Sequence, residues 1–144
     1  MDGSATARIQ EGTSFRSVSD KHLQFVISDP IVDDEHVLVV NMTTFRKDAR
    51  PNDAWADPAC LLEVGDHPQV KWTSCIFYGQ ATITSVQHLE WRADLNRDDN
   101  RRIIFHQPAS PELLRRMREG VTTSVHSLPI HEELLAKQGL LTRS

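Results

Sequence analysis

The sequence predicts a mainly β fold, in which a small, curled antiparallel sheet carries helices gathered toward the C-terminus. Three observations predict this class. Short segments with the apolar patterns of strands follow one another through residues 9–86, and helix start signals appear after residue 109. At 144 residues, the chain also has the length of a single domain with one core.

The first strand is expected within Ile9–Arg16, after a turn in which Gly12 supplies the backbone conformation. In the next segment, Lys21–Ser28, two sets of side chains alternate along the chain: Leu23, Phe25 and Ile27 against Gln24, Val26 and Ser28. This period of two predicts a strand with one buried face.

An acidic turn at Asp29–Glu35 leads into the third predicted strand, His36–Phe45. The acids of the turn are expected to be solvated charge on an exposed connection. Within the strand, Val37–Val40 is apolar at every position, which is typical of a central strand that is covered on both faces or that closes a barrel. The segment Lys21–Phe45 is therefore predicted to form the centre of the sheet.

A polar loop, Arg46–Pro58, is interrupted twice by proline and separates the central strands from the next group. The following apolar segments predict three more strands, at Cys60–Val64, Trp72–Tyr78 and Gln80–Val86. Gly79 lies between the last two and is expected to mark a bulge.

The rest of the chain is expected to be largely helical. Residues 87–102 form a charged segment whose pattern decides neither for nor against a helix, and Ile103–Phe105 is expected as a short strand or core anchor. One helix is predicted to begin at Pro111 with Ser110 as its N-cap and to end at Gly120. Its expected buried face consists of Leu113, Leu114 and Met117.

A second helix is predicted from near Pro129 to Gly139. Its expected inward side chains are Ile130, Leu134 and Leu135. Five or six short strands followed by helices fit a small antiparallel SH3-like barrel. We therefore expect a single domain over residues 1–144, with the barrel core at 9–86 and the charged segment and C-terminal helices at 87–144.

The amino-acid composition limits the classes of function that this protein can have. The net charge of −4 and the pI near 5.9 show no general surplus of Lys and Arg for binding phosphates. No hydrophobic run reaches the roughly 20 residues of a membrane-spanning helix, and the N-terminus lacks a signal-peptide core, so a soluble cytoplasmic protein is expected. Cys60 and Cys75 are expected as buried free thiols, and the Cys and His spacings predict no metal site and no cofactor.

The best candidate site lies where one central strand begins and its neighbour ends. Antiparallel pairing brings Lys21 and His22 toward Thr43 and Thr44. These side chains provide a cation, a group that exchanges protons near neutral pH, and hydroxyls that hold phosphate oxygens. Because RNA carries its own nucleophile, the 2′-hydroxyl, such groups suffice for metal-free cleavage. The alternative is a polar strand entrance facing ordinary strand threonines.

Further candidates lie in the second half of the predicted barrel. His67 is expected in an exposed turn and is the second proton-transfer candidate, the alternative being a histidine hydrogen-bonded to its own loop. Ser74 and Tyr78 share one face of a strand and are candidates for substrate binding, together with Arg46. A buried Tyr78 with an internal hydrogen-bond partner is the alternative for that residue.

The order of these features resembles a known family. The turn and strand Glu11–Phe15, a strand ending in Phe25–Ser28, the strand Val37–Thr44 and the segment Ser74–Tyr78 follow one another along the chain. Over residues 9–86 this order resembles the MazF/PemK-type toxin endoribonucleases of bacterial toxin–antitoxin modules. The resemblance implies an SH3-like barrel, a homodimer, cleavage of single-stranded RNA without metal, and neutralisation by a cognate antitoxin protein.

By position, Lys21 or His22 stands where the family has its catalytic arginine, and Thr43 where it has its conserved threonine. The family's Arg-Pro pair is absent, and lysine does not reproduce the planar two-pronged contact of arginine with phosphate. Catalysis would then rest on His22 and His67, or be lost. Two other functions stay open: a non-catalytic SH3-like module that binds a protein, and a gyrase poison that acts through its C-terminal helix.

Overall fold

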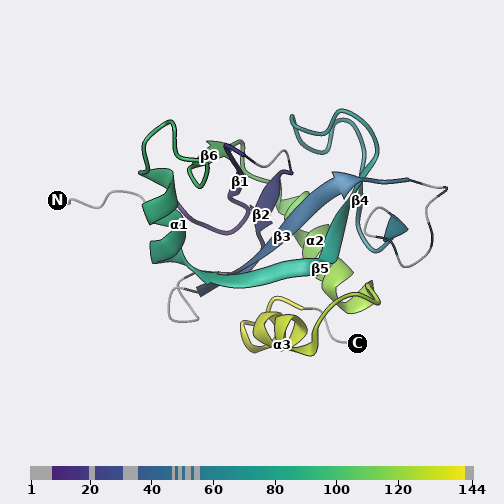
Figure 1. Ribbon diagram of the computed structural model, residues 1–144. Coiled ribbons are helices and arrows are strands. Elements are labelled where there is room, and N and C mark those ends of the chain that lie inside the picture. Colours follow the sequence, from purple (N-terminus) through teal and green to yellow (C-terminus); the bar gives the residue numbers. More distant parts are fainter. Residues whose placement is uncertain are drawn as a thin grey trace.

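The structure is a computed structural model that describes residues 8–19, 22–30, 36–46, 48, 50, 53 and 56–141. Its centre is a curled, six-stranded antiparallel sheet in the order β4-β5-β3-β2-β1-β6 (Figure 1). The strands are β1 (Ser14–Ser17), β2 (Gln24–Val26), β3 (His36–Thr44), β4 (Leu61–Leu62), β5 (Ser74–Ser85) and β6 (Ile103–His106). The mainly β prediction is confirmed. Within the described residues the edge strands β4 and β6 do not pair with each other, so the sheet forms a half-barrel.

Both faces of the sheet are covered, which explains the uninterrupted apolar run in β3. Val37, Leu38, Val39 and Val40 are each at most 2% exposed. Leu38 and Val40 pack in the cluster that includes the α2 and α3 side chains, whereas Val37 and Val39 pack in the cluster around Leu89 of α1. The prediction that β3 is central and covered on both sides is confirmed.

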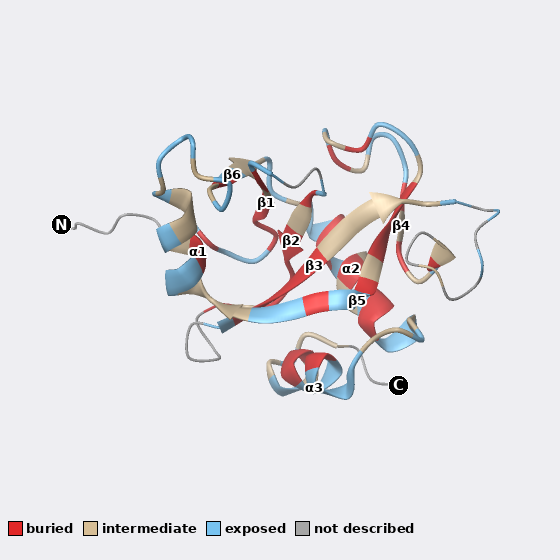
Figure 2. Ribbon diagram, in the orientation of Figure 1, coloured by how far each residue is buried: buried red, intermediate tan, exposed pale blue. Residues whose placement is uncertain are grey.

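The prediction of a single buried face for Lys21–Ser28 is wrong. Val26 and Ser28, expected on the outer face, are both fully buried. Figure 2 shows that β2 is buried along most of its length. Val26 faces the smaller core cluster, which includes Ile103 of β6, because the sheet curls round to bring β6 beside β1. The Ser28 hydroxyl accepts a hydrogen bond from the Leu38 amide at 2.8 Å, so its burial leaves no unpaired hydroxyl.

Three helices complete the described part of the chain: α1 (Val86–Ala93), α2 (Pro111–Thr123) and α3 (Pro129–Lys137). Ser110 caps α2 as predicted, since its side chain accepts a hydrogen bond from the Leu113 amide. Ser85 caps α1 in the same way through His88, which shows that the segment left undecided by the sequence begins as a helix. No helix among the described residues is long and apolar enough to cross a membrane.

The expected end of α2 at Gly120 is wrong, because the helix continues to Thr123. Gly120 is needed for packing: a Cβ atom at this position would overlap the hydroxyl oxygen of Tyr78. The Tyr78 hydroxyl donates to the Met117 carbonyl at 2.6 Å, so strand β5 and helix α2 approach closely at this point. In α3 the predicted burial of Leu134 and Leu135 is confirmed.

Ile130 corrects the sequence-based prediction for α3, because this side chain is 57% exposed instead of pointing inward. His131 takes the buried position one residue later. The expected irregularity near Gly79 is present, since the β3–β5 register shifts between Val39 and Asn41, opposite the segment that contains Gly79. Cys60 and Cys75 are buried free thiols as predicted, and burial raises the pKa of each to about 11.

Candidate functional site

A pocket of about 460 Å³ lies at the end of the sheet where β3 stops and β5 begins. We call it the Arg16 pocket. Residues from β1, the segment just before β2, the end of β3, the loop between β4 and β5 and the start of β5 line it: Arg16, His22, Leu23, Met42, Thr43, Thr44, Gln69, Lys71, Trp72 and Ser74. Its described lining includes two permanent cations, one histidine and three hydroxyl groups, and it includes no carboxylate.

The pairing of β2 with β3 brings His22 and Thr43 together as the sequence predicts. Gln24 is opposite Asn41, and extending this antiparallel register by two residues places His22 opposite Thr43. The Nδ1 atom of His22 lies 3.2 Å from the Met42 carbonyl oxygen. Since a carbonyl only accepts, Nδ1 carries the proton in this contact and the lone pair of the neutral ring is on Nε2. The predicted meeting of His22 with Thr43 and Thr44 is confirmed, and Lys21 lies outside the described residues.

Arg16 provides the cation that sequence reasoning did not assign to the site. Its neighbour Phe15 packs into the core beside α1, and the alternation of a strand directs Arg16 the other way, into the pocket. The Nη2 atom donates to Oε1 of Gln69 at 3.0 Å and lies 3.3 Å from Nε2 of His106. Both partners are neutral acceptors in these contacts, so they orient the guanidinium without cancelling its charge.

Half of the other arginines among the described residues form ion pairs with carboxylates. Ion pairs with Asp or Glu hold Arg8, Arg101, Arg115, Arg116 and Arg118. Arg16 forms none with the described residues. An oriented guanidinium with an uncompensated charge, at the wall of a pocket, is suited to bind an anion such as a phosphate group.

His106 of β6 contacts the same nitrogen of Arg16, Nη2, as Gln69 does. Burial, the charge of Arg16 and the proximity of His67 lower the pKa of His106 below its ordinary value. A guanidinium has no acceptor atom, so the Arg16 contact requires a lone pair on Nε2 of His106. The neutral form of His106 is therefore the form that supports Arg16.

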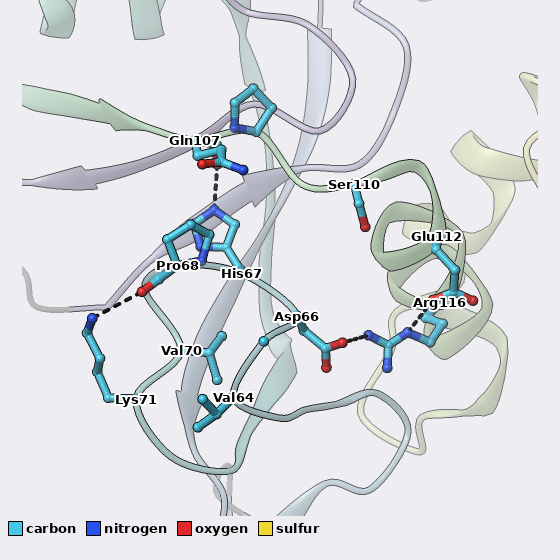
Figure 3. A pocket seen from close by; sticks show the side chains of 12 residues that line it. Val64, Asp66, His67, Pro68, Val70, Lys71, Gln107, Ser110, Glu112 and Arg116 are labelled. Atoms are coloured by element: carbon cyan, nitrogen blue, oxygen red, sulfur yellow. Dashed lines mark hydrogen bonds and ion pairs between the residues drawn. The ribbon is translucent and has the colours of Figure 1, made fainter.

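His67 is buried, at 3% exposure, so the prediction of an exposed turn histidine is wrong. Its Nδ1 accepts a hydrogen bond from the Gln69 amide at 3.0 Å, and Nε2 donates to the Gln107 carbonyl (Figure 3). The ring also packs edge-on against Phe25. The bond with Gln69 matches the alternative of a histidine hydrogen-bonded to its own loop, whereas Gln107 and Phe25 belong to other segments. His67 does not line the Arg16 pocket.

The larger cavity of about 750 Å³ shown in Figure 3 is lined by the loop before β5, by residues 107–110 and by the start of α2, and it shares Lys71 with the Arg16 pocket. Its arginine, Arg116, forms ion pairs with Asp66 at 3.0 Å and Glu112 at 2.9 Å. The positive charge there is balanced by two carboxylates. The Arg16 pocket is smaller but has the unbalanced positive charge, and it is the better candidate for a site that binds anions.

The other predicted substrate-binding residues have different positions. Ser74 lines the Arg16 pocket, although its hydroxyl donates to the Trp72 carbonyl at 2.9 Å. Tyr78 is 1% exposed and bonded to α2, so the alternative of an internally bonded tyrosine is confirmed and a contact with substrate is excluded. Arg46 is exposed just beyond β3 and is not part of the described pocket lining.

Among the lining residues that were not predicted from the sequence, four have polar or aromatic side chains: Arg16, Gln69, Lys71 and Trp72. The adjacent cation and aromatic ring at Lys71 and Trp72 are a signal that the sequence does contain, because this combination is common in nucleic-acid sites. Arg16 and Gln69 offer no such signal, since 53 positions separate them.

No protein-family model matches this chain, and no match was found among curated proteins or solved structures. The described residues also contain no group of three or more His, Cys, Asp or Glu side chains that could hold a metal ion. We therefore infer the function from the chemistry of the Arg16 pocket.

Proposed function

We propose that this protein is a metal-independent endoribonuclease of the MazF/PemK type, which cleaves single-stranded RNA in the Arg16 pocket. One observation carries the proposal: Arg16, His22 and Thr43 line one pocket whose described lining has cations and hydroxyls but no carboxylate. A binding site for phosphodiesters needs this balance, because a carboxylate beside the phosphate would repel it.

The chemistry requires one base, one acid and stabilisation of negative charge. Nε2 of His22 takes the proton of the 2′-hydroxyl, whose oxygen forms a bond to phosphorus as the bond to the 5′-oxygen breaks. Arg16 and the Thr43 hydroxyl hold the phosphate oxygens, on which negative charge accumulates in the transition state. The ammonium of Lys71 gives a proton to the leaving 5′-oxygen, and the products are a 2′,3′-cyclic phosphate and a 5′-hydroxyl.

Arg16 also removes a difficulty in the resemblance to the family. The family's arginine precedes the strand that corresponds to β2, where this chain has Lys21 and His22. Arg16 reaches the pocket from β1 and supplies a planar guanidinium next to His22 and Thr43. The proposed site thus has an arginine from another strand and uses His22 for proton transfer.

The proposal includes the other properties that the resemblance implies. The curled half-barrel supports a relationship to SH3-like barrels. The resemblance implies a homodimer and neutralisation by a cognate antitoxin protein, and we propose a cytoplasmic location with them. Light scattering on the purified protein tests the dimer, and a monomer at micromolar concentration would remove that part of the proposal.

The decisive experiment is cleavage of mixed-sequence single-stranded RNA in the presence of EDTA. We expect cleavage by the wild type, little or none by His22→Ala or Thr43→Ala, and none of a fully deoxy substrate that lacks the nucleophile. Cleavage that is equal in the wild type and in both variants would refute the assignment of the site.

A non-catalytic module that binds another protein is the alternative. The surface before and at the start of α3 favours it, because Val125, Leu128 and Ile130 are 84%, 51% and 57% exposed there. A stable protein partner, together with no RNA cleavage and no growth inhibition on expression, would support this alternative over the nuclease.

A further inference from the structure

Trp72 lies at the rim of the Arg16 pocket with its indole ring held in place. The side chain is 59% exposed, and its Nε1 donates to the Thr44 hydroxyl at 2.7 Å. The ring also borders a second, shallower pocket of about 400 Å³, lined by Thr44, Phe45, Trp72 and Thr73. One tethered indole therefore separates a cationic pocket from a neighbouring hollow that contains a second aromatic side chain.

The exposed face of Trp72 is not explained by packing within the described chain. Trp91 is also exposed, at 47%, but its ring stacks on His88 and lies under the guanidinium of Arg101, whose carbon is 5.0 Å from the ring centroid. Among the described residues no ring or cation stacks on Trp72. The bond to Thr44 restricts the indole while its apolar face stays open to solvent, which lowers the entropic cost of binding a flat ligand.

We propose that Trp72 is a stacking platform for one base of the RNA strand, beside the phosphate that Arg16 holds. The inference rests on the proposed function and extends it to the choice of substrate. Aromatic faces next to backbone-binding cations are the usual means of binding single strands, because every base has a flat face to stack. In a duplex that face is covered by neighbouring base pairs, so the platform selects unpaired RNA.

The assignment also changes the role of Thr44. Its hydroxyl accepts the indole N–H, so Thr44 is a positioning residue for Trp72 and not a direct ligand of the substrate. Thr43, the preceding residue, keeps its place in the pocket as a phosphate ligand. Of these two adjacent threonines on β3, Thr43 would thus bind the phosphate, and Thr44 would position the tryptophan that stacks on the base.

The test measures binding without cleavage, using a single-stranded 2′-O-methyl RNA octamer that lacks the nucleophile. The chain has three tryptophans, so the substitutions Trp55→Phe and Trp91→Phe leave Trp72 as the only indole. We expect the octamer to quench the Trp72 fluorescence in a saturable way. Inorganic phosphate and an octamer that is abasic throughout should leave the fluorescence nearly unchanged, because neither can stack.

Affinity measurements on single variants complete the test. From the usual strength of base–aromatic stacking, Trp72→Ala should bind the octamer about 5- to 150-fold more weakly. Trp72→Phe, which keeps a ring, should lose less, and Trp91→Ala should bind like the wild type. Equal affinity for the normal and abasic octamers, wild-type binding by Trp72→Ala, or no binding by the wild-type protein would each overturn the inference.

The outcomes separate this inference from the proposed function. RNA cleavage with no effect of Trp72→Ala on octamer binding would keep the nuclease and remove the platform. Base-dependent quenching of Trp72 without cleavage of unmodified RNA would keep a nucleic-acid site and remove the nuclease. The abasic comparison uses a chain that retains Trp72, so it is decisive even if the alanine variant fails to fold.

Discussion

Oε1 of Gln69 accepts a hydrogen bond from Nη2 of Arg16 at 3.0 Å, which joins a strand near the N-terminus to a loop 53 positions later. The Gln69 backbone is in turn held by the buried ring of His67. The direction of the Arg16 guanidinium therefore depends on His67 through one intermediate residue. The described structure brings no carboxylate to this guanidinium, so the charge is available to an anion in the pocket.

Replacing the arginine should affect the chemical step most. We expect Arg16→Ala to lower the rate of RNA cleavage about 10²- to 10³-fold, the usual effect of removing a charged group that stabilises a transition state. Arg16→Lys should recover only part of this loss, because an ammonium lacks the planar fork. The matched control is Arg97→Ala, an exposed arginine outside the described pocket lining, which should cleave like the wild type. Equal losses in the two alanine variants would argue against a specific role for Arg16.

The neutral character of Gln69 should matter as much as its hydrogen bond. In Gln69→Glu a carboxylate of the same shape would pair with Arg16 and cancel its charge, so we expect binding of the 2′-O-methyl octamer to weaken about tenfold, or about 1.4 kcal/mol. The slope of log affinity against log salt should fall by about one. Gln69→Leu keeps the charge and should leave that slope unchanged. The same slope in the wild type and Gln69→Glu would show that Arg16 does not contact phosphate.

His67 should prove to be a positioning residue. His67→Phe keeps a ring against Phe25 but leaves the Gln69 amide without its acceptor, which should cost about 1–3 kcal/mol of unfolding free energy in urea. At a temperature where the variant is folded, the pH dependence of cleavage should keep its shape. Loss of one limb of that profile would instead show that His67 transfers a proton. His22→Ala is the matching variant, and it should remove the limb assigned to the base.

Two histidines, the half-buried His106 and the buried His131, should make the fold less stable in mild acid. The pKa values of His106 and His131 are lowered in the folded state, in both cases chiefly by burial, and for His106 also by Arg16 and His67. The unfolded chain therefore binds more protons just below the ordinary histidine pKa of about 6.5, and the unfolding free energy should fall as the pH drops through that value. The loss should level off once the pH is below the folded pKa values. Urea titrations between pH 5 and 8 should show a shallower fall for His106→Gln and for His131→Gln, and unchanged curves would contradict the assignment.

The packing of α2 on β5 offers a test of the fold itself. Gly120→Ala places a methyl group against the Tyr78 hydroxyl, so we expect a loss of about 1–3 kcal/mol of unfolding free energy from overpacking. Removing that hydroxyl in a Tyr78→Phe background should reduce the cost of the alanine. A double-mutant cycle in urea measures this coupling, and strictly additive effects would place the two residues apart.

Local rules predicted part of this structure well. The N-cap at Ser110 and the apolar run Val37–Val40 depend on nearby residues, and both were read correctly from the sequence. The meeting of His22 with Thr43 was also predicted, because consecutive antiparallel strands joined by a short loop have few possible arrangements. These features are determined by residues that lie close together in the sequence, so the sequence alone was enough to predict them.

The errors involve contacts between distant residues. Gly120 was predicted to end a helix, but it is a glycine because the Tyr78 side chain leaves no room for a Cβ atom. Tyr78 lies 42 positions before Gly120 in the chain. His67 looked exposed because its turn is polar, yet the Gln107 carbonyl and Phe25 bury it. Arg16 was missed because the direction of its side chain depends on contacts with Gln69 and His106. His106 is brought close by the pairing of β1 with β6, and Gln69 by the path of the loop between β4 and β5.

The most direct test of the proposed function is the chemistry of the RNA ends that the protein creates. Single-stranded RNA is incubated in EDTA with the wild type, His22→Ala or Arg16→Ala, and the fragments are analysed by mass spectrometry. We predict 2′,3′-cyclic phosphate and 5′-hydroxyl ends from the wild type and strongly reduced cleavage by both variants. Intact RNA with the wild type, or fragments with 5′-phosphate ends that do not depend on His22 and Arg16, would contradict the proposed nuclease.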